Sequence, residues 1–131
     1  MIISSIKKKK PNNKDLAKQF VLHCAELALD KKAFNLVILD VRPWQGLMDY
    51  LLICSAQSSV QAQSLSDYIY ETLKKEGRTP IGMEGREQGR WVLLDYGEVV
   101  IHVFYEYIRE FYDLEGLWQD ASRLRVPKHK R

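Results

Sequence analysis

The sequence predicts an α/β fold in which a mixed sheet of about five strands is flanked by helices. Two observations lead to this prediction. Three segments carry apolar residues at the spacing of an amphipathic helix, and strand-length runs rich in Val, Ile, Leu and aromatic residues lie between them. In chain order the elements are a helix, two strands, a helix, a short strand, two strands and a helix. This order gives a mixed sheet with helices packed on it.

A helix is predicted over residues 13–32 and a strand over residues 34–41. Asn13 or Asp15 can cap the start of this helix, because a short polar side chain accepts a hydrogen bond from a free N–H group of the first turn. The strand contains the uninterrupted apolar run 36–39. The helix is recognised by apolar side chains that recur every three or four residues: Ala17, Phe20, Val21, Cys24, Leu27 and Ala28.

A loop, a second strand and a second helix follow. Residues 42–46 are predicted as a loop because they contain Pro and Gly, and residues 49–54 as a strand. The polar turn 55–59 can cap a helix that runs to about Glu76, with Gly77 as its stop. One stripe of this helix is formed by Leu65, Tyr68, Ile69, Thr72 and Leu73.

The last third of the chain begins with residues 81–83, which have the length of a short strand, and ends with a helix predicted over about 108–124. Arg109 and Glu110 are read as the solvated start of that helix. Its inner stripe is predicted to consist of Phe111, Leu114, Trp118 and Ala121.

Between these elements, the runs WVLLD and EVVIHVFY predict an antiparallel hairpin. Gly97 supplies the positive φ of a tight turn and Tyr96 is expected to be exposed there; in a two-residue loop Asp95 faces Glu98. One face is then wholly aliphatic and must be core: Val92, Leu94, Val99, Ile101 and Val103. The other face mixes aromatic and imidazole groups, is edged with charge, and suits a protein partner better than a small substrate: Trp91, Leu93, Val100, His102 and Phe104.

The charge of the chain is unevenly placed. The formal net charge is +3, but four lysines lie at 7–10 and three further basic residues are Lys128, Lys130 and Arg131. Without those seven, thirteen basic residues remain against seventeen acidic ones, so the body carries −4. We therefore expect disordered basic tails over 1–12 and 125–131 around one domain over 13–124. The tails either aid solubility alone or touch the phosphates of an RNA partner.

Cysteine usage and the N-terminus favour a cytoplasmic protein. Cys24 and Cys54 lie in apolar segments and are expected to be buried free thiols, and no CxxC or Cys/His cluster suggests a metal site. The first residues place an apolar tip before the lysines, the reverse of a secretory signal. No apolar run approaches the ~20 residues that span a membrane.

The hairpin block also carries a family resemblance. WVLLDYGEVVIHVF followed by REFYDLEGLW resembles the ribosomal silencing factor family, also called Iojap-like proteins. The resemblance runs from about residue 15 to residue 121 and includes Asp40-Val41, Asp49-Tyr50 and Met83-Glu84-Gly85. Each motif alone is weak, but the three motifs WVLLD, IHVF and LEGLW in this order are specific.

The resemblance implies a function. Members of this family are not enzymes; they bind the large ribosomal subunit through its ribosomal protein number fourteen, block joining of the small subunit, lower translation when nutrients are scarce, and often form homodimers. A nucleotidyltransferase-like but non-catalytic fold is implied, without cofactor or metal. The expected partner-binding residues are Trp91, Leu93, Asp95, Tyr96, His102 and Phe104.

Plainer roles stay open for several of these residues. Trp91 can be core, and Asp95 can merely cap the turn. A single His on a strand is more often a structural hydrogen-bonding residue than a general base, because catalysis needs positioned partners. Trp118 lies on a helical stripe, which favours core.

The alternatives to a ribosome-binding factor are a nucleotidyltransferase and a direct RNA-binding module. A nucleotidyltransferase places carboxylates two apart on a strand, but Asp40-x-Arg42 and Asp49-x-Leu51 each lack the second carboxylate. Gly82, Gly85 and Gly89 precede a strand, not a helix, so they indicate a flexible turn segment rather than a phosphate loop. A direct RNA-binding module is disfavoured because the basic residues gather in the tails without interleaved aromatics.

The chain departs from the family at one turn. Members usually have Gly-Thr-Ser-x-Arg-His before the central helix, where this chain has Ala56-Gln57-Ser58-Ser59-Val60-Gln61. The serine is kept, whereas Val60 and Gln61 replace the basic pair. A role of that pair therefore does not transfer to this protein.

Overall fold

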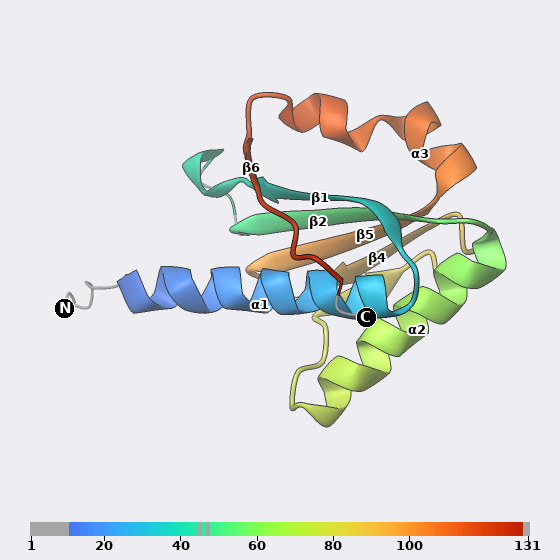
Figure 1. The fold of residues 1–131 in the computed structure, drawn as a ribbon, viewed down its shortest axis with the longest axis horizontal. Helices are drawn as coiled ribbons and strands as arrows, with labels where there is room; N and C mark the ends of the chain where they lie inside the picture. Colours follow the sequence, from blue (N-terminus) through green and yellow to red (C-terminus); the bar gives the residue numbers. More distant parts are fainter. Residues whose placement is uncertain (1–10, 45, 47, 130–131) are drawn as a thin grey trace.

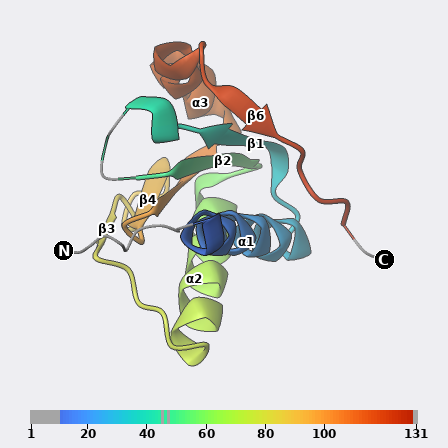
Figure 2. The ribbon, with the colours of Figure 1, turned by 90° about the vertical axis from the view of Figure 1, so that its left-hand side faces the viewer.

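A computed structural model of the chain describes residues 11–44, 46 and 48–129. It contains a six-stranded mixed sheet with the strand order β3-β4-β5-β2-β1-β6. Helices α1 and α2 pack on one face of the sheet, and α3 lies on the opposite face (Figures 1 and 2). The predicted α/β class with a mixed sheet is confirmed, with one strand beyond those expected.

The bounds of most elements agree with the sequence prediction to within a few residues. In chain order the elements are α1 (Pro11–Asp30), β1 (Phe34–Asp40), the 3-10 turn η2 (Arg42–Trp44), β2 (Tyr50–Ala56), α2 (Ser59–Lys75), β3 (Gly82–Glu84), β4 (Trp91–Asp95), β5 (Val99–Tyr105), α3 (Glu106–Tyr112), the 3-10 segment η3 (Leu114–Trp118) and β6 (Ser122–Leu124). Strands β2 and β5 are parallel neighbours, and the other four strand pairs are antiparallel.

Helix α1 begins earlier than predicted, at Pro11. Proline suits the first turn of a helix because its missing N–H is not needed there and its φ is already helical. Asn13 and Asp15 lie inside the helix, so the prediction that one of them caps it is wrong. Residues 1–10 and 130–131 lie outside the described residues, and the two predicted tails stay predictions. Within the second, His129 Nε2 lies 3.2 Å from an Asp30 carboxylate oxygen of α1.

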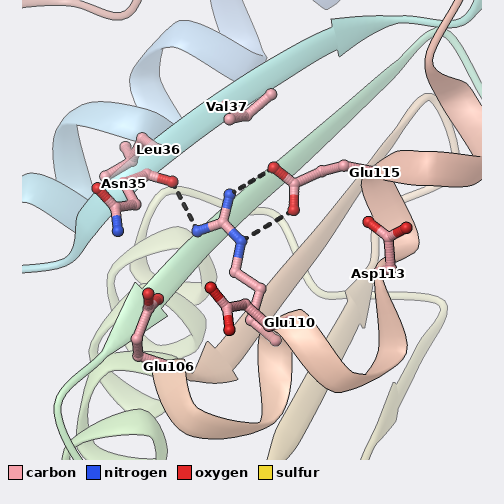
Figure 3. Close-up of a pocket in the computed structure, with 8 residues that line it drawn as sticks. Asn35, Leu36, Val37, Glu106, Glu110, Asp113 and Glu115 are labelled. Atoms are coloured by element: carbon pink, nitrogen blue, oxygen red, sulfur yellow. Dashed lines mark hydrogen bonds and ion pairs between the residues drawn. The ribbon is translucent and has the colours of Figure 1, made fainter.

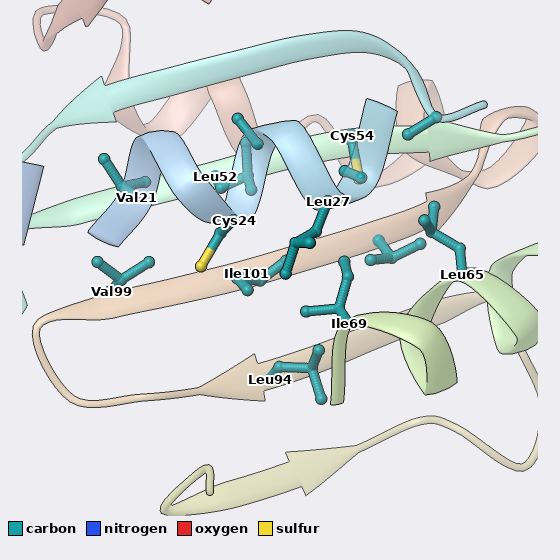
Figure 4. Close-up of a cluster of buried hydrophobic side chains, with 14 of the residues drawn as sticks. Val21, Cys24, Leu27, Leu52, Cys54, Leu65, Ile69, Leu94, Val99 and Ile101 are labelled. Carbon is teal, nitrogen blue, oxygen red and sulfur yellow. The ribbon is translucent and has the colours of Figure 1, made fainter. Parts of the chain in front are cut away.

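Strand β2 is the centre of the molecule, with all seven of its residues buried. Between this strand, α1 and α2 lies the larger core, and the aliphatic face of the hairpin is part of it, as predicted (Figure 4). Cys24 and Cys54 are buried free thiols, and burial raises the pKa of the Cys54 thiol to about 12. The core side chains labelled in Figure 4 are Val21, Cys24, Leu27, Leu52, Cys54, Leu65, Ile69, Leu94, Val99 and Ile101.

A smaller core on the other face is formed under α3 and η3. Its fully buried members are Leu39, Val41, Leu51, Ile53 and Phe104. The predicted final helix over 108–124 is wrong: α3 ends at Tyr112 because Asp113 adopts a left-handed conformation with φ +46°, and the chain continues as η3 and then as β6 beside β1. Leu114, Trp118 and Ala121 pack inward as predicted, but Phe111 is 81% exposed.

The start of α2 shows how the family's altered turn is built in this chain. Ser58 is the N-cap of α2, and its hydroxyl accepts a hydrogen bond from the Gln61 N–H at 3.0 Å. The side-chain oxygen of Gln61 in turn accepts the Gln57 N–H. The polar turn was predicted to begin at Ser55, which instead is a buried residue of β2. Helix α2 stops at Gly77, which has φ +93°, as predicted.

Candidate partner-binding surface

The pairing of the hairpin strands differs from the predicted register by two residues. Trp91 lies opposite Phe104 and Leu93 lies opposite His102, whereas the predicted neighbour of Trp91 was His102. A shift of two residues leaves every side chain on its own face, because side chains alternate with period two. The predicted composition of both faces is therefore confirmed, although the predicted pairing is wrong.

The cause of the shift is the turn. Asp95 pairs with Val100 rather than with Glu98, so four residues lie between the last paired residues instead of two. The Tyr96 N–H donates to the Val99 carbonyl at 2.9 Å, and Asp95 Oδ1 accepts the Gly97 N–H at 2.8 Å. Gly97 has φ +90°, which glycine adopts without strain. Asp95 therefore does cap the turn, and within the described part of the chain its other carboxylate oxygen accepts no hydrogen bond.

Tyr96 is not exposed, and that prediction is wrong. Its side chain is 4% exposed and belongs to the larger core, where its ring meets Phe20 of α1 edge-on at 5.5 Å. The Arg78 guanidinium lies 4.0 Å from the Phe20 ring centroid and donates to a Glu98 carboxylate at 3.2 Å. Burial raises the pKa of the Tyr96 hydroxyl. Tyr96 therefore positions the turn against α1 and does not present its ring to a partner.

One end of the mixed hairpin face is closed by aromatic stacking. Trp91 stacks on Phe104 with ring centroids 4.8 Å apart, and Tyr112 of α3 lies 4.9 Å from Trp91. The Trp91 Nε1–H donates to His102 Nδ1 at 2.9 Å. His102 is 6% exposed, and burial lowers its pKa to about 4, so the imidazole is neutral near pH 7. Phe104 is fully buried and can act on a partner only by supporting Trp91.

The other end of the same face is open. An apolar hollow lies beside the turn, between the hairpin, the approach to β2 and the residue before β3. Ile81, which is 78% exposed, is held there by its N–H, which donates to the Asp95 carbonyl at 2.6 Å. A hollow lined mainly by apolar groups with one carboxylate at its rim is suited to receive a side chain of another protein. Its lining consists of Met48, Ile81, Leu93, Asp95, Gly97, Val100 and His102.

Two contributors to the hollow were missed by sequence reasoning. Ile81 was predicted as part of a strand, and Met48 was given no role. Both residues reach the hollow because a residue close to each of them pairs with the hairpin. Tyr50, two residues after Met48, pairs with Val99 of β5, and Gly82, the residue after Ile81, pairs with Asp95 of β4. An exposed apolar residue next to a short edge strand, as at Ile81, was the one local signal that could have indicated it.

The two carboxylates of the nucleotidyltransferase alternative are Asp40 and Asp49. Asp40 accepts two hydrogen bonds from the Arg42 guanidinium at 2.8 and 2.6 Å, and these bonds hold the pKa of Asp40 below its usual range. Burial raises the pKa of Asp49. Over the described ranges, no group of three or more His, Cys, Asp or Glu side chains is arranged to hold a metal ion.

Arg109 was predicted as a solvated helix residue, and this is wrong. It is 7% exposed, and its hydrogen bonds join α3 to η3 and to the sheet. Its guanidinium donates two bonds to the Glu115 carboxylate at 3.0 and 2.9 Å, one to the Asn35 carbonyl at 2.7 Å and one to the Ser55 hydroxyl at 2.7 Å. Arg109 therefore holds the α3 and η3 layer on the sheet and, with it, Tyr112 over Trp91.

Comparison with known proteins assigns this architecture to a family. A family model described as "Ribosomal silencing factor during starvation" matches residues 14–131. The ribosomal silencing factor RsfS of Halalkalibacterium halodurans is 38% identical over 112 residues, which cover 85% of this chain and 96% of that protein. A mouse protein named for mitochondrial assembly of the ribosomal large subunit is 30% identical over 95 residues, 70% of this chain and 42% of its own length. The crystal structure of a Chromobacterium violaceum protein superposes with a TM-score of 0.76 at 29% identity, covering 88% of this chain and 92% of that one.

Proposed function

This chain belongs to the ribosomal silencing factor family, and from that membership we propose that it binds the large ribosomal subunit and keeps the small subunit from joining. The family membership makes it a ribosome-associated regulator of translation. The large subunit is the proposed partner because a relative from mouse is named for assembly of that subunit. We propose ribosomal protein number fourteen as the direct contact, as the family resemblance implies.

The observation that carries the proposal is the open hollow on the mixed face of the hairpin. Five of its seven lining residues belong to the sequence block that bears the family motifs, and the hollow joins an apolar floor to the turn-capping carboxylate of Asp95 at the rim. Leu93 lines this hollow directly, and Trp91 extends the face toward α3. His102 orients Trp91, and Phe104 supports it from below. Tyr96 contributes by fixing the turn that carries Asp95.

Charge favours a basic partner. The chain without its terminal basic residues has thirteen basic and seventeen acidic side chains, a net charge of −4. Asp95 at the rim of the hollow keeps one carboxylate oxygen available for a cation, and such a charge steers association more than it adds affinity. The basic tails would add contacts to ribosomal RNA, which salt would weaken steeply.

The proposed mechanism is steric and needs no reaction. The domain would occupy the surface of the large subunit where a bridge to the small subunit forms. In the absence of ribosomes, the same apolar hollow would be covered by a second copy, which gives a weak symmetric dimer that competes with ribosome binding. Light scattering at increasing concentration tests this dimer, which purely monomeric behaviour into the hundred-micromolar range would exclude.

Sedimentation with isolated subunits tests the function. We expect the protein to travel with purified large subunits and to be captured by the isolated fourteenth ribosomal protein. Small subunits alone serve as the control and should not carry it. Preincubation with large subunits should lower the yield of joined ribosomes when small subunits are added. Travel with small subunits only, or with neither subunit, would refute the proposal.

A further inference from the structure

The outer side of α3 carries aromatic rings that the hairpin surface does not use. Tyr107 and Phe111 lie one helical turn apart and are 78% and 81% exposed. Together with Ile108 and Glu110 they line a shallow hollow. Large aromatic side chains gathered in the open are uncommon on a protein that has no partner at that place.

A second hollow adjoins the first and shares Glu110 with it. Its walls bring together the side chains of Glu106, Glu110, Asp113 and Glu115 (Figure 3), and Arg109 also lines it. The Arg109 guanidinium is paired with Glu115, and no cation of the described residues pairs with the other three carboxylates. One oxygen of Glu106 is buried and finds no hydrogen-bond donor in the part of the chain that the structure describes. Within the described residues, the second hollow therefore carries three carboxylates without a cationic partner, and the buried oxygen of Glu106 among them lacks a hydrogen-bond donor.

We propose that the outer side of α3 is a second docking site, which takes a basic polypeptide segment of another protein. An Arg or Lys side chain of that segment enters the acidic hollow, where it supplies the donor that Glu106 lacks. A neighbouring apolar side chain packs on Phe111 and Tyr107, and a cation that passes over these rings gains a further attraction. The carboxylates repel phosphate groups, which favours a polypeptide over RNA.

This docking site goes beyond the proposed function and does not depend on it. It differs from the hairpin hollow in chemistry, because the hairpin hollow is apolar with a single carboxylate at its rim. The two surfaces adjoin through Tyr112, whose ring lies 4.9 Å from Trp91 and 5.2 Å from Phe111. The two surfaces are therefore contiguous.

Titration of the isotope-labelled full chain, followed by NMR, tests this proposal without ribosomes. The probe is a helical peptide with leucines on one face and arginines on the other, and its control has glutamates in place of the arginines. We expect the arginine peptide alone to shift backbone amide signals within residues 106–115. Shifts confined to residues 93–100, or none, would overturn the proposal. Equal shifts with a uridine oligonucleotide, or shifts that follow protein concentration without peptide, would assign the surface to RNA or to a second copy instead.

Two variants locate the contact. Glu110→Lys and Phe111→Ala should each weaken the arginine peptide by about tenfold or more. Both side chains are exposed, so the fold should be unchanged. On α2, Glu71→Lys makes the same charge reversal and Val60→Ala truncates another exposed apolar side chain, and both variants should bind the peptide like the parent chain. Equal affinity of all four variants would rule out the site.

Discussion

Trp91 and His102 are joined by a hydrogen bond that runs diagonally across the hairpin, from the indole Nε1–H to imidazole Nδ1 at 2.9 Å. The indole can only donate, so Nδ1 carries no hydrogen and the neutral imidazole holds its hydrogen on Nε2. The bond therefore fixes both the tautomer of His102 and the orientation of Trp91. A protonated His102 would have to give up this bond.

Stability should fall as the pH is lowered from 6.5 toward 4, because His102 stays neutral in the folded protein. Its pKa is about 4 when folded against an ordinary value of 6.5, so between these values the unfolded chain binds a proton that the folded chain does not. The contribution of His102 to the free energy of unfolding is complete above pH 6.5, and roughly 2 kcal/mol of it is lost by pH 4.5. Denaturant unfolding of the parent chain and of His102→Gln checks this. An equal pH dependence of the two proteins in this window would contradict it.

Ile81→Asp should weaken binding to the large subunit without affecting the fold. Ile81 is 78% exposed, so the free energy of unfolding should change by no more than about 0.5 kcal/mol. A carboxylate in the apolar hollow that faces an apolar partner group should weaken affinity by about tenfold or more. Val60→Asp places the same charge at a position that is 71% exposed on α2 and is the control. Quantitative sedimentation with large subunits compares the two variants.

Trp91→Ala should reduce both affinity and stability. The indole is half-buried, stacks on Phe104 and donates to His102, which lines the hollow, so its loss should cost about 2 kcal/mol or more of binding. Loss of the stack and of the bond to His102 should also lower the free energy of unfolding by about 2–3 kcal/mol. Thermal melting and affinity must be measured on the same protein. A stable variant that binds large subunits as well as the parent would remove Trp91 from the surface.

Two substitutions of Asp95 distinguish the effect of its charge from the effect of the hydrogen bond with which it caps the turn. Asp95→Asn keeps an oxygen for the Gly97 N–H, so stability should be preserved while association with a basic partner slows. Asp95→Ala also removes the cap and should cost about 1 kcal/mol of stability. Stopped-flow association at several salt concentrations is the measurement. An unchanged association rate for Asp95→Asn at low salt would show that the carboxylate does not face the partner.

Arg109→Met should be among the most destabilising substitutions on the second face. It leaves the Glu115 carboxylate and the Ser55 hydroxyl without their buried donor, at a cost of about 3 kcal/mol. Arg86 makes a similar bidentate pair with Asp67, but both side chains are nearly half exposed, so Arg86→Met should destabilise the fold far less than Arg109→Met. Chemical denaturation of both variants provides the comparison. Similar losses would show that burial does not set the strength of the Arg109 pair.

Features that depend on neighbours along the chain could be predicted from the sequence. Because side chains alternate along a strand, Val92 and Leu94 were predicted to share a core face, and the observed register leaves them on it. Ser58 in the polar turn caps helix α2, as expected. Such features are local, because side-chain parity and capping bonds involve residues close in sequence.

Features that depend on distant segments were mispredicted. Tyr96 at a hairpin turn looks exposed until α1 brings Phe20 against it, 76 positions earlier in the printed sequence. Arg109 looks solvated because its acceptors Asn35 and Ser55 lie on β1 and β2. The hollow beside Asp95 was missed for the same reason, since its walls come from segments that only the sheet order brings together.

The order of the strands also bears on when a newly made copy becomes active. Tyr50 of β2 has its parallel neighbour in Val99, and β6, which covers the outer edge of β1, is made later still. While the chain is being synthesised, β2 therefore keeps an open edge until the hairpin emerges, and the layer that holds Tyr112 over Trp91 emerges after it. The proposed partner-binding surface can therefore assemble only when almost all of these segments have been synthesised. On the proposed function, a nascent copy does not yet carry a complete binding surface for the ribosome that is making it.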